Sequence, residues 1–247
     1  MGKIIVIGAG FSGSIIARKI ADELNRPVQI VEKRQHIAGN MFDEKDEHGI
    51  LVQRYGPHVL VTNYWRIVDY LSRFAKMIPY TVKELSYIDG RYVRLPFNFE
   101  SIQQLIGPEQ AEYLIGKLRE IYPARDRVPV GELVNSDDSR VADFGMLLFE
   151  KAYRTYCAKQ WGIPINQLDK SIMERVPIAI SYDERYMNRD FQYIPEEGFT
   201  SLFETMLKHP NINVRTGEDA LEHISFNAES KTVEYDGEEV DALVFTG

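Results

Sequence analysis

The glycine pattern near the start of the chain constrains its fold more than any other feature. The stretch "KIIVIGAGFSGSIIARKI" opens with mostly β-branched residues, places glycines at Gly8, Gly10 and Gly13, and then repeats apolar residues at helical spacing. This order predicts a strand, a tight turn and a helix, which is the context of a dinucleotide-binding loop. In such a loop the glycines let the backbone approach a pyrophosphate, and the N–H groups of the helix start bind it.

A second strand ends in an acid that narrows the choice of nucleotide. The stretch "PVQIVEK" reaches Glu32 about 20 residues beyond the glycines, where an acid accepts the ribose hydroxyls. The same carboxylate disfavours a 2′-phosphate, so the pattern predicts FAD rather than NADP. The alternative, an ordinary βαβ unit with Glu32 on its surface, is less consistent with this spacing.

Composition excludes several other classes of protein. Apolar residues at 44% and charged residues at 27% are typical of a globular protein, and 247 residues suffice for one large domain or two small ones. The first residues show no signal-peptide pattern, and no stretch approaches the ~20 apolar residues of a membrane span. The single cysteine, Cys157, excludes an internal disulfide, and the net charge of −8 disfavours nonspecific nucleic-acid binding. The expected location is the cytoplasm, with no nucleic-acid or membrane partner.

The rest of the chain alternates strand-like and helical segments. "ELSYIDGRYVRLPF" predicts a hairpin that turns at Asp89-Gly90, and "GFTSLFETMLKHP" predicts a short helix that ends before Pro210. The charged, turn-rich segment 123–138 predicts an irregular connection. Further helices are expected at about 63–74, 108–122 and 141–159, and strands in "INVRT" and "KTVEYDGEEVDALVFTG".

This order of segments predicts an α/β fold, in which an FAD-binding Rossmann-like (GxGxxG) domain carries an inserted helical domain and an antiparallel sheet. We expect the FAD-binding part over residues 1–80 and a hairpin and helical substrate domain over residues 81–174. Residues 175–247 are expected to form a sheet domain that returns to the FAD-binding part. Such an interrupted nucleotide fold is typical of two-domain flavoproteins, which is an analogy at the level of the fold.

Seven short motifs occur in one order along the whole chain. They are "GAGFSG" (8–13), "HIAGN" (36–40), "YGPH" (55–58), "LPFNF" (95–99), "KQWG" (159–162), "RVPI" (175–178) and "YDERYMNRDFQYIPEEGFT" (182–200). In their order and spacing they resemble the UDP-galactopyranose mutase family. Many FAD amine-oxidase relatives share the glycine loop, whereas "KQWG" followed by "RVPI" and the tyrosine-rich stretch is much more specific.

The resemblance implies a flavin-dependent isomerase, an intramolecular transferase that interconverts UDP-galactopyranose and UDP-galactofuranose for cell-surface polysaccharide synthesis. In that family reduced FAD attacks the anomeric carbon through N5, and the sugar of the resulting adduct opens and recloses as a furanose. The implied partners are a UDP-sugar substrate and an external reductant such as NAD(P)H. No metal is implied, and the resemblance is compatible with a homo-oligomer.

The resemblance also assigns roles to individual residues. It makes Arg175 and His58 the catalytic residues, and Arg175 suits a diphosphate because its guanidinium is always charged and forks onto two oxygens. It assigns Tyr156, Trp161, Arg175 and Tyr186 to the substrate; core packing remains the alternative for Tyr156 and Trp161. The expected FAD-binding residues are Gly8, Gly10, Phe11, Ser12, Gly13, Glu32, Lys33, Gly39, Asn40, His58 and Val59.

Three positions depart from the family pattern where the hexose is expected to rest. Val61 replaces a usual histidine, Val82 replaces an asparagine or another polar residue, and Cys157 replaces a threonine. A buried hydroxyl without a partner costs about 1–3 kcal/mol, so these positions leave the identity of the hexose open. Flavin and UDP binding depend on other residues.

Other readings follow from these departures and from the chain's length. Family members continue past the position of Gly247, so the chain is expected to be either a truncated form or a naturally short relative. One alternative is a mutase that acts on another UDP-hexose, and a second is a catalytically silent protein that binds FAD or a UDP-sugar. A conventional FAD oxidoreductase is a less favoured third alternative.

Overall fold

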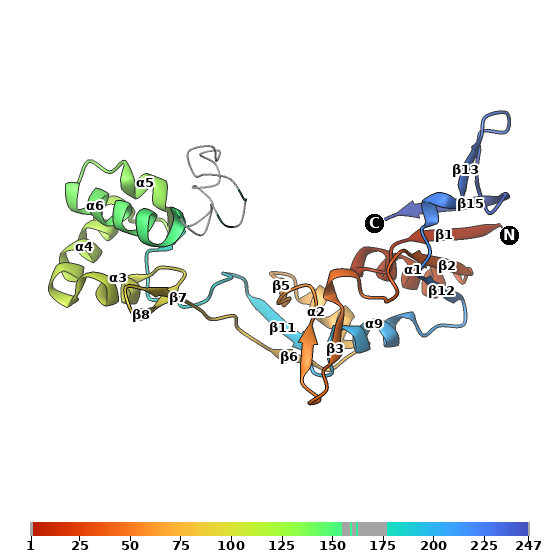
Figure 1. The fold of residues 1–247 in the computed structure, drawn as a ribbon, viewed down its shortest axis with the longest axis horizontal. Coiled ribbons are helices and arrows are strands. Elements are labelled where there is room, and N and C mark those ends of the chain that lie inside the picture. Colours follow the sequence, from red (N-terminus) through yellow and green to blue (C-terminus); the bar gives the residue numbers. More distant parts are fainter. Residues whose placement is uncertain (1, 155–158, 160–161, 163–176, 247) are drawn as a thin grey trace. The chain divides into compact units, whose positions relative to one another are not determined.

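The computed structural model describes residues 2–154, 159, 162 and 177–246, and it divides into two compact units. Residues 1–80 and 189–247 form the first, which we call the Rossmann unit (Figure 1). Residues 81–188 form the second, which we call the helical unit. The parts predicted from the sequence, residues 1–80, 81–174 and 175–247, are defined by their expected functions, whereas the two units are defined by their internal contacts. The functional division stays a prediction.

A mixed sheet with the strand order β12-β2-β1-β15-β14-β13 forms the centre of the Rossmann unit. The strands β12, β2, β1 and β15 run parallel, and β14 and β13 extend the sheet antiparallel. Because β1 and β2 are largely buried, they consist mainly of β-branched residues. The bounds are β1 Lys3–Ile7, β2 Val28–Glu32, β12 Ile212–Thr216, β13 Ile224–Asn227, β14 Thr232–Tyr235 and β15 Glu238–Phe245.

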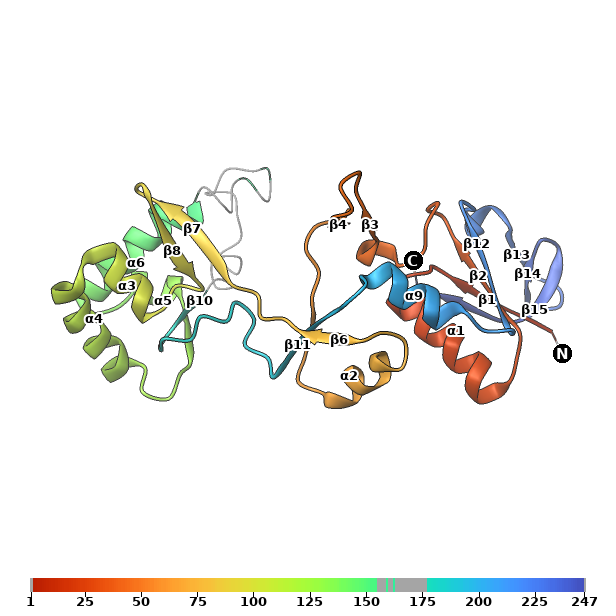
Figure 2. The same cartoon turned by 90° about the horizontal axis from the view of Figure 1, so that it is seen from below.

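Two helices, α1 (Phe11–Leu24) and α9 (Phe199–Leu207), pack against one face of this sheet. They lie side by side in Figure 2 and touch where the ring centroids of Phe11 and Phe203 are 4.7 Å apart. On the other face, the fully buried Tyr235 belongs to a second apolar cluster. The sheet is therefore covered on both sides, as a parallel sheet requires.

Smaller elements complete the Rossmann unit. The strands β5, β11 and β6 form an antiparallel sheet in the order β5-β11-β6, and β3 pairs with β4. The buried carboxylate of Asp43 accepts the N–H groups of Phe199 and Thr200 at 2.7 and 2.8 Å, so β3 caps the start of α9. The bounds are η1 Gly39–Met41, β3 Asp43–Lys45, β4 Leu51–Gln53, β5 Leu60–Thr62, α2 Trp65–Ser72, β6 Met77–Pro79, β11 Phe191–Pro195 and η4 Ala220–Glu222.

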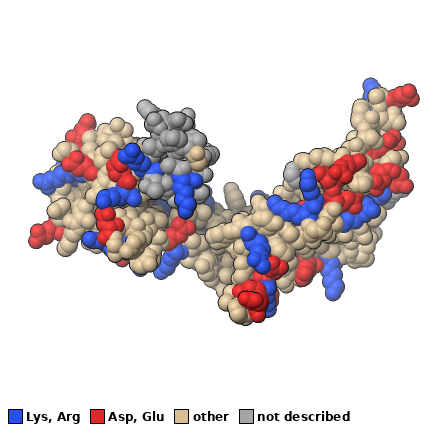
Figure 3. Space-filling model, in the orientation of Figure 1, with Lys and Arg blue, Asp and Glu red and all other residues tan. Residues whose placement is uncertain are grey.

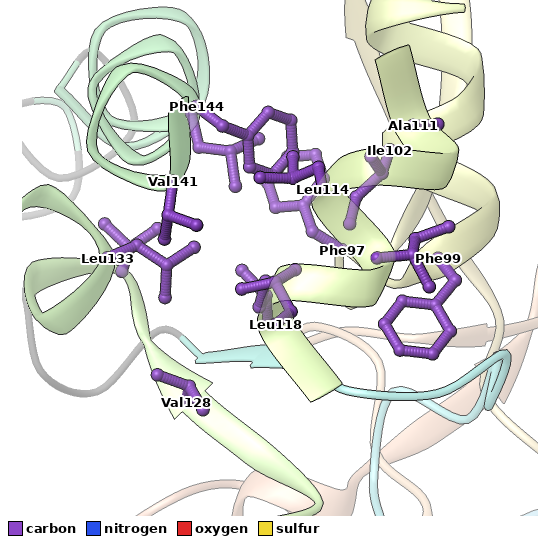
Figure 4. Close-up of a cluster of buried hydrophobic side chains, with 14 of the residues drawn as sticks. Phe97, Phe99, Ile102, Ala111, Leu114, Leu118, Val128, Leu133, Val141 and Phe144 are labelled. Atoms are coloured by element: carbon purple, nitrogen blue, oxygen red, sulfur yellow. The ribbon is translucent and has the colours of Figure 1, made fainter. Parts of the chain in front are cut away.

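The helical unit has its own apolar core, to which helices and strands of the unit contribute (Figure 4). Phe97, Leu118 and Leu133 are almost completely buried in it. The helix α3 begins with a capping box, in which the side chains of Asn98 and Ser101 each accept the other's backbone N–H. The bounds are β7 Glu84–Ile88, β8 Arg91–Leu95, α3 Phe99–Ile106, α4 Pro108–Ile121, β9 Arg127–Pro129, α5 Val130–Val134, α6 Ser139–Leu148, η2 Phe149–Tyr153 and β10 Pro177–Ala179.

The structure confirms the hairpin at Asp89-Gly90 and the helices α2, α4 and α9, but it corrects the helical unit in two places. The segment 123–138 is not irregular, because Val128 and Leu133 are buried in the core and form parts of β9 and α5. The helix expected over 141–159 begins two residues earlier, at Ser139, as α6 and continues from Phe149 as the π-helical segment η2, while residues 155–158 of the expected helix lie outside the described residues. Because charged residues stand close to Val128 and Leu133 in the sequence, the pattern did not indicate that these two side chains are buried.

The surface carries charges of both signs. Figure 3 shows Lys and Arg side chains interspersed with Asp and Glu over the visible face of both units. Among the residues that the structure describes, no helix is both long and apolar enough to span a membrane. The same residues contain no group of His, Cys, Asp and Glu side chains suited to a metal ion.

Candidate functional site

The glycine loop lies between the end of β1 and the start of α1. Gly8 has φ +100°, a conformation that L side chains rarely adopt. A Cβ on Gly13 would lie 1.9 Å from the carbonyl oxygen of Gly8, so only glycine lets α1 approach the strand this closely. Gly10 is the N-cap of α1, a helix described in full that has neither a side-chain cap nor an acid in its first turn. The N–H groups at this helix start are therefore available to a phosphate.

A second backbone loop closes on the first. Ala38 has φ +72° and donates its N–H to the carbonyl oxygen of Ala9 at 2.9 Å. The next residue, Gly39, approaches so closely that a Cβ on it would lie 3.1 Å from the Cα of Gly10. The "HIAGN" motif therefore brings Gly39 and the exposed Asn40 to the glycine loop.

Glu32 joins the glycine loop to the turn that follows β2. Its side chain is buried, with 8% of the residue exposed. One carboxylate oxygen accepts the N–H of Ala9 and the other accepts the N–H of Arg34, both at 2.8 Å. Each carboxylate oxygen has two lone pairs, so Glu32 keeps acceptor capacity for a ribose hydroxyl. Its predicted role at a ribose is compatible with this geometry and stays a prediction.

The two cations after Glu32 point to different partners. Lys33 is exposed and donates to Asp219 at 2.7 Å. Arg34 places its guanidinium 4.6 Å from the ring centroid of Tyr55 and donates through Nη2 to Asn40 at 2.9 Å. Its Nη1 is buried and has no hydrogen-bond partner among the described residues. Lys33 is a predicted FAD-binding residue and Arg34 is not, although both follow the acid directly.

The end of β15 reaches the same edge of the sheet as the glycine loop. Thr246 donates its N–H and its Oγ1 to the carbonyl oxygen of Ile7, at 2.9 and 2.7 Å. A Cβ on Gly13 would lie 2.9 Å from this Oγ1. In open α/β sheets ligands bind outside the carboxyl ends of the parallel strands, which is where these residues meet. Thr246 was not among the predicted site residues, and its only signal was its place after the last strand.

The remaining predicted FAD contacts lie at the start of α1 and between β4 and β5. Ser12 is exposed, whereas Phe11 packs against Phe203 of α9. His58 and Val59 are half-buried in the turn that precedes β5. Direct contacts thus join the glycines, Glu32 and the "HIAGN" loop, and among the described residues none of these contacts involves His58.

The helical unit contains a separate cavity of about 380 Å³. Its walls are mainly apolar, with polar groups contributed by Glu84, Ser86, Arg127 and Tyr186. Burial raises the pKa of the Glu84 carboxyl above its ordinary value. The full lining is Glu84, Ser86, Leu95, Pro96, Phe97, Arg127, Ala152, Tyr153, Pro177, Tyr186 and Met187.

Tyr186 is held at this cavity through its backbone. Its N–H donates to the carbonyl oxygen of Val82 at 3.3 Å. The guanidinium of Arg127 donates to the carbonyl oxygens of Arg185 at 2.9 Å and of Tyr186 at 3.3 Å. Arg127 therefore holds two consecutive carbonyl groups beside the predicted substrate residue, a role that the sequence did not reveal.

Three predicted substrate residues, Tyr156, Trp161 and Arg175, lie outside the described residues, as does Cys157. The chain on either side of this segment, at Tyr153 and Pro177, lines the cavity. Of the other positions that depart from the family pattern, Val82 is half-buried in the helical unit. Val61 is half-buried in β5, where it pairs with Gln192 of β11.

Two family models match the chain. The model described as UDP-galactopyranose mutase matches residues 151–247. The model described as an NAD(P)-binding Rossmann-like domain matches residues 6–74, which contain the glycine loop and Glu32. The second match confirms the dinucleotide-binding fold that the glycine spacing predicts.

Curated relatives are similar over most of the chain. The dTDP-fucopyranose mutase of Escherichia coli is 33% identical over 223 residues, which are 88% of this chain and 57% of the relative. The probable UDP-galactopyranose mutase of Klebsiella pneumoniae is 31% identical over 223 residues, 88% of this chain and 56% of the relative. The UDP-galactopyranose mutase of Mycoplasma pneumoniae is 31% identical over 85% of this chain and 53% of its own length. The chain therefore spans little more than half the length of these relatives.

Solved structures share the fold. A crystal structure of reduced UDP-galactopyranose mutase matches all of this chain and 56% of its own, with a TM-score of 0.65 and 22% identity. An oxidoreductase from Methanosarcina mazei matches 99% of this chain and 58% of its own, with a TM-score of 0.55 and 16% identity. At such identities the likeness confirms the α/β fold class alone. The family model over residues 151–247 and the curated relatives show that the chain is similar in sequence to UDP-galactopyranose mutases.

Proposed function

We propose that the chain acts as a flavin-dependent mutase that interconverts the pyranose and furanose forms of a UDP-hexose, with UDP-galactose as the first candidate. The observation that carries the proposal is the uncapped start of α1 at the glycine loop, in a chain whose residues 151–247 match the mutase model. An uncapped helix start suits the diphosphate of a dinucleotide. Nη1 of Arg34, a buried donor without a hydrogen-bond partner in the part of the chain that the structure describes, supports a bound acceptor near the same loops.

The residues of the Rossmann unit fit FAD. The glycine loop would hold the pyrophosphate, since Gly13 lets the start of α1 lie directly against the backbone of Gly8 and Gly10 adds no side chain at the helix start. Glu32 would accept ribose hydroxyls with its remaining lone pairs. Arg34 would complete its hydrogen bonds on the cofactor, while Asn40 holds the other end of its guanidinium. The roles predicted for Phe11, Ser12, Lys33, Gly39, His58 and Val59 are part of the same proposal.

When bound, reduced FAD would supply through N5 the nucleophile for the anomeric carbon, so that the overall reaction involves no net change of oxidation state. The chain's own residues would bind and orient the substrate. The cavity of the helical unit, with Tyr186 at its wall, would take the nucleotide end. Arg175 would neutralise the diphosphate as UDP leaves and returns, and Tyr156 and Trp161 would contact the nucleotide sugar. An external reductant such as NAD(P)H would keep the cofactor reduced.

A second substrate deserves equal testing, a nucleotide-linked 6-deoxyhexose. Among the relatives, the protein named dTDP-fucopyranose mutase has 33% identity to this chain. Fucose carries a methyl group where galactose carries a hydroxymethyl group. Valine at positions 61 and 82 supplies apolar surface where the family pattern has polar side chains, and apolar surface favours a methyl group over an unpaired hydroxyl.

The products of two parallel incubations distinguish the candidate functions. The protein is loaded with FAD, reduced with dithionite without oxygen, and incubated separately with UDP-galactofuranose and dTDP-fucofuranose before the nucleotide sugars are separated by chromatography. We expect conversion to the pyranose in at least one incubation, and none in a control that keeps FAD oxidised. A sugar product of altered oxidation state would contradict the proposal and show that the protein is an oxidoreductase. Flavin binding without conversion of either sugar would contradict the proposal and show a catalytically silent binding protein.

A further inference from the structure

The turn between β4 and β5 is held by a side chain of the strand that enters it. Gln53 is the last residue of β4, and its Nε2 donates to the carbonyl oxygen of His58 at 3.1 Å. Its Oε1 accepts the backbone N–H of the same residue at 2.5 Å. One primary amide therefore satisfies both backbone groups of His58, as a residue on a neighbouring strand would do.

This contact fixes a stretch of chain that has no regular secondary structure of its own. Within the turn, Gly56 has φ +95°, in the left-handed region, and a Cβ there would meet no atom within 4 Å. The glycine therefore allows the left-handed backbone conformation at position 56, and the two hydrogen bonds from Gln53 hold the backbone at His58. Gln53 is half-buried, so its two hydrogen bonds are partly shielded from water, which strengthens them.

The imidazole of His58 turns back onto the same loop. Its Nδ1 lies 2.8 Å from the carbonyl oxygen of Gly56. A carbonyl oxygen accepts hydrogen bonds and cannot donate one, so the proton of the neutral imidazole must be on Nδ1. The lone pair of the neutral ring is then on Nε2, which is left as a hydrogen-bond acceptor.

We propose that Gln53 is the positioning residue of His58: it closes the turn so that the imidazole keeps its Nδ1–H on Gly56 and presents Nε2 as an acceptor. A catalytic effect of this positioning rests on the proposed function, in which His58 is a catalytic residue. The positioning itself rests on the contacts among Gln53, Gly56 and His58. In this arrangement Gln53 acts through His58, to whose backbone both of its amide hydrogen bonds go.

The test reads the tautomer of His58 directly. Protein with ¹⁵N-labelled histidine is studied by NMR, without FAD, at a pH where imidazole rings are neutral. His58 is assigned by comparison with His58→Gln. In the unmodified protein we expect the Nδ1–H tautomer of His58. In Gln53→Met, which keeps the length of the side chain and removes both hydrogen bonds, the ratio of the two tautomers should fall by about tenfold, or ~1.4 kcal/mol.

Two further variants complete the design. Gln53→Glu keeps the acceptor for the N–H of His58 and loses the donor for its carbonyl group, so we expect a smaller shift of the same sign. Gln110→Met makes the matched change at an exposed position of α4 and should leave His58 unaltered. An Nε2–H tautomer in the unmodified protein, or an unchanged tautomer in folded Gln53→Met or Gln53→Glu, would overturn the proposal. Because the measurement uses no flavin and no substrate, its failure is distinct from a failure of the proposed mutase activity.

Discussion

The carboxylate of Glu32 accepts the backbone N–H of Ala9 at 2.8 Å, so the acid at the end of β2 also holds the glycine loop in shape. Its other oxygen accepts the N–H of Arg34. A residue predicted from its spacing as a ribose ligand therefore has a structural task as well. Loss of this side chain should affect the loop and the cofactor together.

The variant Glu32→Gln tests this double task. An amide can accept only one of the two N–H groups and must turn its own NH₂ group toward the other. We expect the free energy of unfolding to fall by about 1–3 kcal/mol, the cost of a buried unsatisfied group, and FAD to bind more weakly. Urea unfolding and a flavin fluorescence titration measure the two effects. Glu23→Gln, at an exposed position of α1, is the matched control, and equal stability of the two variants would contradict the inference.

A pair of glycine substitutions tests the close contact between strand and helix. In Gly13→Ala the new Cβ would lie 1.9 Å from the carbonyl oxygen of Gly8, so the helix must shift. We expect a loss of ~1–3 kcal/mol or more, as for other overpacked sites. In Gly116→Ala, inside α4, the Cβ meets nothing within 4 Å, and we expect a gain of about 0.5–1 kcal/mol. Thermal unfolding of both variants decides, and a wild-type melting temperature for Gly13→Ala would refute the contact.

The guanidinium of Arg127 offers a test of the cavity in the helical unit. Arg127→Lys keeps the charge but cannot fork onto the carbonyl oxygens of Arg185 and Tyr186. We expect the dissociation constant of UDP to rise about tenfold, which is ~1.4 kcal/mol, because Tyr186 is less well placed. Arg125→Lys alters the exposed ion pair with Glu132 and serves as the control. Isothermal titration measures the dissociation constant of UDP for both variants. Equal values would show that Arg127 does not contribute to the nucleotide site.

The raised pKa of Glu84 predicts a pH-dependent gain in stability for Glu84→Gln. Because burial raises this pKa, the folded state binds the proton more tightly than the unfolded state. The unmodified protein therefore loses stability as the pH rises from about 4.3, the ordinary value for glutamate, through the raised pKa. We expect Glu84→Gln to unfold at higher urea concentration at pH 7, with the difference shrinking toward pH 4. Glu112→Gln, exposed on α4, controls for the loss of charge, and a difference that grows toward acid pH would be of the wrong sign.

The predicted catalytic role of Arg175 has a direct kinetic test. If Arg175 neutralises the departing diphosphate, Arg175→Ala should lower kcat by ~10²-fold or more, as for the loss of one preorganised electrostatic donor. Arg175→Lys should recover little of this, because lysine cannot fork. Arg154→Ala, which removes an exposed arginine paired with Glu150, should keep the unmodified rate. Turnover of Arg175→Ala at the wild-type level would make Arg175 an ordinary charged residue.

A double substitution tests which sugar the protein prefers. Val61→His with Val82→Asn restores the polar residue types of the family pattern. If the two valines disfavour hydroxyl groups, the double variant should shift binding toward UDP-galactose by about tenfold, or ~1.4 kcal/mol, relative to UDP-glucose. Calorimetric titration of both sugars against both proteins measures the shift. A strong preference for UDP-galactose in the unmodified protein would show that these valines do not face the hexose.

Features that depend on neighbours along the chain could be predicted from the residues alone. The spacing of Gly8, Gly10 and Gly13 after a β-branched run specified a strand, a turn and a helix, and the Asp89-Gly90 pair specified a hairpin. These are local signals because φ > 0 and close backbone approach are needed at fixed positions. They were sufficient for the fold class and for the phosphate loop.

The directions of the polar side chains around that loop follow from contacts that the folded chain makes. Lys33 and Arg34 are adjacent in sequence, yet Lys33 pairs with Asp219 while Arg34 turns to Asn40 and Tyr55. In the same way β9 and α5 exist because their apolar side chains are buried by a core that other elements supply. The physical reason is that a side chain's direction and burial depend on partners far away in the sequence, which only the folded chain brings into contact.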